Sequence, residues 1–212
     1  GVAVLRFDFT GLGQSGGDFA DSSFSSNAAD LLAAAKYLRT TYAAPALLIG
    51  HSLGGAAVLA AAGAIPEVRA VATIGAPSEV SHVAHHLGSQ RDAIEAEGRA
   101  EVRLGGRSLT ITRQFVDDLS KHDLLDLVGR LRRPLLVMHA PRDEIVGIDH
   151  ASRIFLAAKH PRSFISLDDA DHLLLRAEDA QYAADVIAVW ASRFISRPAE
   201  RHAVTATHDA VP

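Results

Sequence analysis

Short apolar runs alternate with amphipathic or alanine-rich stretches along most of this 212-residue chain. Five runs have the length and residue types of β-strands: residues 2–9, 46–50, 70–75, 134–139 and 162–168. They lack regular polar alternation, which is typical of parallel strands covered by helices on both faces. The pattern therefore predicts an α/β fold with a mostly parallel sheet.

Helical patterns separate the predicted strands. Residues 25–42 carry apolar side chains at the spacing of one helix face. Residues 54–64, 150–160 and 178–195 are alanine-rich or amphipathic and predict three further helices. This alternation of strand and helix is the order that parallel sheets require.

Residues 78–130 break this rhythm with charged helical stretches and a predicted hairpin that turns at Gly105–Gly106. We interpret this segment as a small lid insertion over the sheet. Residues 1–195 then form one core domain, and residues 196–212, which have no apolar period, form a linker or tail.

Net charge, cysteine content and the length of the apolar runs argue against several classes of function. The formal net charge of −4 and the lack of a lysine–arginine cluster argue against a nucleic-acid partner. The chain has no cysteine, which excludes disulfides, thiolate nucleophiles and zinc–thiolate sites. No apolar run has the length of a membrane span and no signal peptide is present, so we expect no membrane partner and a cytoplasmic location.

Gly11, Gly13 and Gly16 form a G-x-G-x-x-G pattern after the first predicted strand, as in dinucleotide-binding sites. Such a site needs a helix that begins at the third glycine, but here a loop follows and the helix begins near Ser26. The acidic residue at the expected distance, Asp30, falls inside that helix instead of ending a strand. The pattern therefore does not predict a nucleotide, and no cofactor is expected.

The sequence "LLIGHSLGGAAVLAA" contains Gly50-x-Ser52-x-Gly54 between a predicted strand and a predicted helix. This is the context of a nucleophile elbow, a tight turn that exposes a strained serine. We expect Gly50 and Gly54 to remove side chains that would clash in the turn, and Gly55 to ease the approach of the helix. Ser52 is the predicted nucleophile.

A serine nucleophile needs a base, and the base needs an orienting acid. In this architecture the acid and then the histidine follow the serine along the chain. Asp143 follows the strand at 134–139, and His172 follows the strand at 162–168. Glu144 remains an alternative acid. We expect Asp168, Asp169 and Asp171 to shape the loop of His172.

Other histidines suggest weaker hypotheses. His51, within the elbow, is expected to pack or form hydrogen bonds rather than act as a second base, and His139 is expected to be structural. His82 and His86 have a spacing that could bind a metal on a helix, but they lack the glutamate of an H-E-x-x-H site. No metal is therefore predicted.

With these motifs in place, residues 1 to about 195 resemble the α/β-hydrolase superfamily. The chain looks most similar to the hydrolase part of bacterial proteins in which an α/β hydrolase is fused to a C-terminal OsmC-like domain. The stretches "PALLIGHSLGGAAVLAAAG" and "VGIDHASRIFLAAKHPRSFISLDDADHLL" carry that similarity. In such hydrolases "RFDFTGLGQS" resembles a loop beside the active site, which implies that Arg6, Asp8, Gly11, Gly13 and Ser15 are scaffold residues.

The resemblance also implies a departure from the family. Family members have eight strands, and the five predicted here match the fourth to the eighth, so the first three strands are expected to be missing. The chain begins at Gly1 within a strand-like run, which favours a fragment of a longer protein. One oxyanion-hole amide is expected from Leu53. The other belongs to the loop after the third strand, so we expect the fragment alone to be poorly active.

The resulting hypothesis is a serine hydrolase that acts on an ester or related acyl bond of a small-molecule substrate through an acyl-enzyme. Two alternatives remain open. A cofactor-free haloperoxidase or perhydrolase would use the same three residues, and a non-catalytic binding module could serve a fused partner.

Overall fold

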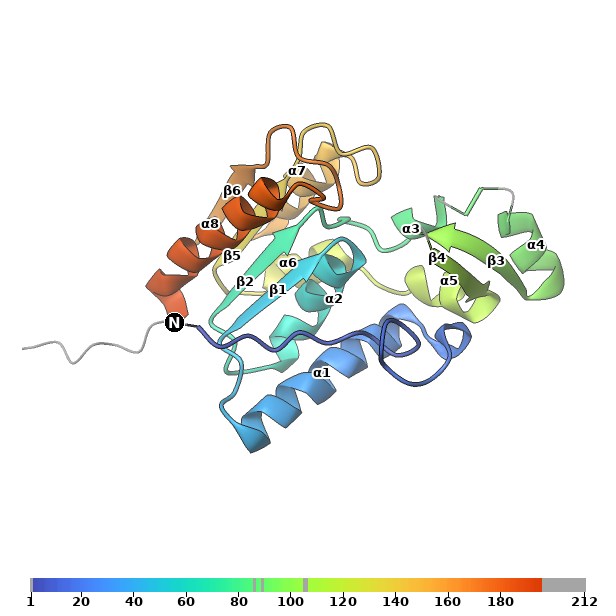
Figure 1. Cartoon of the computed structure of the whole chain (residues 1–212), viewed down its shortest axis with the longest axis horizontal. Coiled ribbons are helices and arrows are strands. Elements are labelled where there is room, and N and C mark those ends of the chain that lie inside the picture. Colours follow the sequence, from blue (N-terminus) through green and yellow to red (C-terminus); the bar gives the residue numbers. More distant parts are fainter. Residues whose placement is uncertain (1, 86, 89, 105–106, 196–212) are drawn as a thin grey trace, which may run out of the picture.

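The computed structural model of the protein describes residues 2–85, 87–88, 90–104 and 107–195. The predicted turn at Gly105–Gly106, His86 and the predicted tail at 196–212 lie outside the described residues. Figure 1 shows a central sheet with helices packed on both of its faces. The predicted α/β class with a mostly parallel sheet is therefore confirmed.

The main sheet contains four parallel strands in the order β1-β2-β5-β6. The strands are β1 (Leu47–His51), β2 (Ala70–Ile74), β5 (Leu135–His139) and β6 (Arg162–Ser166). Every residue of β5 is buried, whereas the edge strand β1 leaves Ile49 46% exposed. Because all four strands run in one direction, their carboxyl ends lie along one edge of the sheet.

The prediction of a strand over residues 2–9 was wrong. These residues have no strand assignment, and residues 2–8 are exposed, with Val4 at 76%. A cavity of about 330 Å³ lies between this segment and β1, lined by Phe7 and Phe9 from the segment and by Ile49 and His51 from β1. An apolar run becomes a strand only when its main chain pairs with a neighbour, and across this gap it does not pair with β1.

Two hydrophobic clusters cover the two faces of the sheet. The larger includes buried side chains of α1 (Phe24–Thr41), α2 (Leu53–Ala61), α6 (Leu124–Arg130) and α7 (Ile148–Ala157). The smaller joins strand residues to α8 (Ala177–Ile195) through Ala183 and Ile187. Two short 3₁₀ turns, Phe19–Asp21 and Ala62–Ala64, precede α1 and follow α2. Burial of both sheet faces explains why the strands lack polar alternation.

The insertion at residues 78–130 contains the expected hairpin. Its strands are β3 (Arg99–Leu104) and β4 (Arg107–Thr112), and its helices, besides α6, are α3 (His82–His85), α4 (Gln90–Glu97) and α5 (Arg113–Leu119). The main-chain N–H and hydroxyl of Ser25 donate hydrogen bonds of 2.7 and 2.8 Å to Asp118. These bonds fasten α5 to the start of α1, and Figure 1 shows the hairpin to one side of the sheet.

Candidate active site

Ser52 occupies the sharp turn between β1 and α2. Its backbone has φ 51° and ψ −126°, a conformation that residues with a side chain rarely adopt. The turn is held because the N–H of Ser52 donates to the carbonyl of Ile74 at 2.8 Å, and its own carbonyl accepts from the N–H of Gly55 at 2.8 Å. The serine is therefore the first residue beyond a rigid strand, in the strained geometry expected of a nucleophile elbow.

The glycines around Ser52 have different roles. A Cβ at Gly50 would lie 2.3 Å from the carbonyl oxygen of Gly54, and one at Gly55 would lie 2.6 Å from the Cβ of Ala76. A Cβ at Gly54 would lie 3.9 Å from Phe9 Cε2, the nearest atom outside the helix itself, and this distance is an ordinary van der Waals contact. The expectation that Gly54 relieves a steric clash was wrong, because the close approach is made by Gly50 and Gly55.

The structure brings Ser52, His172 and Asp143 together in one hydrogen-bonded line. The Ser52 Oγ lies 2.9 Å from Nε2 of His172, and Nδ1 of His172 lies 2.6 Å from Oδ2 of Asp143. Since the carboxylate can only accept, Nδ1–H donates to it, which leaves Nε2 to accept the serine proton. The side chains of His172 and Asp143 are almost fully shielded from solvent.

The turn after β5 holds Asp143 in place. Its Oδ1 accepts hydrogen bonds from the N–H groups of Ile145 and Val146 at 2.9 and 2.8 Å. Burial raises the pKa of Asp143, but the bonds from His172 and these amides outweigh it and leave the pKa below its usual value. Asp143 is therefore ionised at neutral pH. Glu144, the alternative acid, is exposed, and the imidazole bond is made by Asp143.

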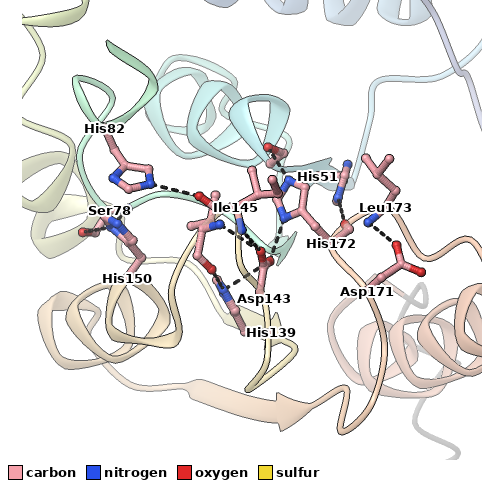
Figure 2. A network of polar contacts seen from close by, with 12 residues as sticks. His51, Ser78, His82, His139, Asp143, Ile145, His150, Asp171, His172 and Leu173 are labelled. Carbon is pink, nitrogen blue, oxygen red and sulfur yellow. Dashed lines mark hydrogen bonds and ion pairs between the residues drawn. The ribbon is translucent and has the colours of Figure 1, made fainter. Parts of the chain in front are cut away.

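Two further histidines donate to main-chain carbonyls near these residues (Figure 2). His51 Nε2 lies 2.6 Å from the carbonyl oxygen of His172. His139 is fully buried, and its Nε2 lies 2.7 Å from the carbonyl of Val146, which closes the turn that carries Asp143. The positions of both agree with the hydrogen-bonding and structural roles expected from the sequence.

The loop of His172 is shaped by one of its neighbouring acids. The Asp171 carboxylate accepts the N–H groups of Leu173 and Leu175 at 2.7 and 3.1 Å. Asp168 has a positive φ of 45°, and Asp169 forms an exposed ion pair with Arg142. Asp171 thus has the loop-shaping role that the sequence suggested for this group.

Sequence reasoning missed Gly75, which directly follows β2 and lies beside His172 and Asp143. Its φ is +55°, and a Cβ there would lie 3.3 Å from Nδ1 of His172 and 3.4 Å from Oδ2 of Asp143. A glycine directly after a buried strand, in "AVATIGAP", is the signal that could have identified it.

Of the two histidines considered for a metal, His86 lies outside the described residues and His82 has other partners. Nε2 of His82 lies 3.1 Å from the carbonyl of Ile145, and its ring centre lies 4.3 Å from that of His150. His150 Nδ1 accepts from the N–H of Ser78 at 3.1 Å. Among the described residues, no group of three or more metal-ligating side chains is gathered.

The glycine-rich loop is held by carboxylates. Asp30 accepts the N–H and the hydroxyl of Thr10 at 2.9 and 3.1 Å, and Asp8 accepts the N–H of Gln14 at 3.0 Å. The side chain weighed as a ribose ligand therefore fastens this loop to α1.

Comparison with known proteins agrees with this geometry. Residues 1–89 match the family model Hydrolase_4, described as serine aminopeptidase, S33. The chain is 49% identical to the esterase domain of a Rhodothermus marinus protein, with a TM-score of 0.72 over 90% of this chain and 74% of that one. At 18% identity, Est1E from Butyrivibrio proteoclasticus with bound ferulic acid has the same fold, with a TM-score of 0.75 over 90% of this chain and 76% of that one.

Among curated proteins, the chain is 30% identical over 157 residues to a mouse palmitoyl-protein thioesterase, mitochondrial ABHD10. The match covers 69% of this chain and 50% of that protein, so the chain spans about half the length of the curated relatives it matches. Taken with the fold and the elbow, these similarities define the class: the chain belongs to the α/β-hydrolase superfamily.

Several expectations remain predictions, among them the lid role of residues 78–130, the missing first three strands, the fusion to an OsmC-like domain and the cytoplasmic location. The described helices include none with the length and apolarity needed to cross a bilayer.

Proposed function

We propose that this protein is a serine hydrolase that cleaves a carboxylic ester or thioester of a small-molecule substrate through an acyl-enzyme. The observation that carries the proposal is the unbroken hydrogen-bonded line from Ser52 Oγ through His172 to Asp143. The names of the relatives, an esterase domain and a thioesterase, support an acyl substrate.

The line of contacts defines the proton path. Ser52 Oγ attacks the substrate carbonyl while its proton moves to Nε2 of His172. The Asp143 carboxylate, held by the amides of Ile145 and Val146, fixes the imidazole tautomer and stabilises the imidazolium. His172 then protonates the leaving group, and the same residue activates water to release the acyl group from Ser52.

Leu53 supplies the proposed oxyanion donor. It is the first residue of α2, where main-chain N–H groups have no partner within the helix and the helix dipole favours negative charge. A second donor, as the superfamily resemblance implies, stays a prediction.

Steady-state hydrolysis tests the proposal. We expect the purified full-length protein to hydrolyse a short p-nitrophenyl ester or an acyl thioester, and Ser52→Ala and His172→Ala to lower kcat by at least about 10³-fold. Unchanged turnover in Ser52→Ala would show that the activity arises elsewhere. Turnover that requires peroxide would favour the perhydrolase chemistry instead.

A further inference from the structure

His51 makes a long-range hydrogen bond to the residue that we propose as the base. Its Nε2 lies 2.6 Å from the carbonyl oxygen of His172, 121 positions along the chain. A carbonyl oxygen can only accept, so the imidazole Nε2–H of His51 donates. Figure 2 shows the His51 side chain directed toward the main chain of His172, beside the line formed by His172 and Asp143.

The loop on which His172 sits is buried at Ala170, which is 2% exposed, and Leu174 packs against the smaller hydrophobic cluster, but the residues next to His172 lie at the surface. Its neighbours Asp171 and Leu173 are exposed, and the bonds that Asp171 accepts come from within the same loop. These local bonds fix the shape of the loop but not its place over the sheet. The bond from His51 joins the main chain of this loop to the end of β1.

The anchor point is close to the nucleophile. His51 and Ser52 are consecutive residues, and the N–H of Ser52 is bonded to Ile74 in the neighbouring strand. The bond therefore ties the main chain of the base to the same rigid turn that holds the serine. A shift of the loop relative to Ser52 would have to break it.

The charge state of His51 suits this role. Burial lowers its pKa, an effect that its bond to the His172 carbonyl only partly offsets, so it is neutral at physiological pH. The groups that act on it electrostatically are His172, whose ring centre lies 5.0 Å away, and the carboxylates of Asp143 and Asp171. A neutral His51 places no positive charge beside the imidazolium that forms on His172 during proton transfer.

We propose that His51 is a positioning residue that holds His172 in register with Ser52 through its Nε2–H bond to the His172 carbonyl. This inference rests on the proposed function, since it assigns His51 a role only through the base. This role requires a side-chain N–H donor at position 51, and an apolar side chain that only fills the space would not perform it.

The rate of covalent labelling by a fluorophosphonate tests the inference. In His51→Leu we expect the second-order rate of labelling at Ser52 to fall about tenfold to a hundredfold, because small misplacements of a catalytic group cost that much. The fraction finally labelled should equal that of the wild type. His51→Gln, which keeps a side-chain N–H donor of similar reach, should recover most of the rate.

Controls separate positioning from folding. The labelled fraction measures the population of folded sites, and thermal melting measures their stability, so a purely structural role would lower these and leave the rate constant unchanged. His160→Leu alters an exposed histidine before β6, at the opposite end of the strands, and should leave the rate unchanged. If His51→Leu aggregates, His51→Asn, whose amide ends closer to the main chain, replaces it.

Equal labelling rates in wild type and His51→Leu would overturn the inference, as would a His51→Gln variant as slow as His51→Leu at full labelled fraction. Absence of labelling in the folded, full-length wild type would instead overturn the proposed function. With an ester substrate, the inference further predicts that kcat falls while KM stays unchanged.

Discussion

Gly75 lies against His172 so closely that a methyl group on its Cα would be 3.3 Å from the imidazole Nδ1. That nitrogen is the atom that bonds Asp143, and the backbone of Gly75 has a positive φ. A glycine directly after β2 therefore makes room for the contact between His172 and Asp143.

Gly75→Ala should damage both stability and activity. We expect a loss of about 1–2 kcal/mol in the free energy of unfolding from the left-handed backbone, and a lower kcat because the new methyl group crowds the bond between His172 and Asp143. Urea denaturation and ester hydrolysis measure the two effects. Gly63→Ala, where a Cβ would have no atom outside its own helical turn within 4 Å, is the matched control. Equal losses in both variants would contradict this explanation.

Alanine substitutions at the three elbow glycines should differ in their effect on stability. Gly50→Ala and Gly55→Ala introduce contacts of 2.3 and 2.6 Å, so we expect little folded protein from the first and a clear loss of stability in the second. Gly54→Ala should fold normally, and alanine's helix propensity should offer up to about 1 kcal/mol of added stability. Thermal melting of the three variants checks this order, and a Gly54→Ala variant as unstable as Gly55→Ala would refute it.

Substitution of each carboxylate in turn tests whether Asp143 or Glu144 orients His172. Asp143→Asn should lower kcat by about 10³- to 10⁴-fold, because the amide can no longer fix the imidazole tautomer. Glu144→Gln, one residue away and exposed, should have nearly wild-type kcat. The reverse outcome would assign the acid to Glu144.

Acid should destabilise the protein in a first step below about pH 6.5. Burial lowers the pKa of both His51 and His150, so the unfolded chain binds protons in this range that the folded protein does not. The free energy of unfolding therefore falls as pH drops from about 6.5 and levels off below the folded pKa values. Urea midpoints at several pH values measure this, and His150→Asn should show a smaller drop. A wild-type midpoint that stays constant from pH 8 to pH 5 would contradict it.

A second step should follow below about pH 4. Burial raises the pKa of Asp118, but the donors of Ser25, together with His122, outweigh it and leave the pKa below its usual value, as for Asp143. Stabilisation from these carboxylates is present above the unfolded pKa and is lost as pH falls through the folded value. In Asp118→Asn the loss of stability between pH 5 and pH 3 should be smaller than in the wild type.

Much of the fold could be predicted from hydrophobic patterning. Four of the five predicted strands are present within one or two residues of their expected ends. The apolar runs of β2 and β5 are buried between helix layers, and β1 and β6 pair with them on either side. The run at residues 2–9 has the same composition but no partner strand in the described part of the chain. Pairing is a tertiary property, so local sequence could not reveal its absence.

The site could be predicted only in part for a related reason. Ser52, Asp143 and His172 follow strand ends in a characteristic order, and parallel strands bring such ends to one edge of the sheet. Gly75 and the bond from His51 to the His172 carbonyl depend on contacts between distant segments. A single glycine after a strand, or a histidine next to the nucleophile, gives no indication of the atom it will meet.

The most direct test of the central claim is to map where a fluorophosphonate attaches to the intact, folded protein. Peptide mass spectrometry should find the adduct on Ser52, and labelling should disappear in Ser52→Ala and slow by about 10³-fold or more in His172→Ala. An adduct on another residue, or labelling that persists in Ser52→Ala, would contradict the account.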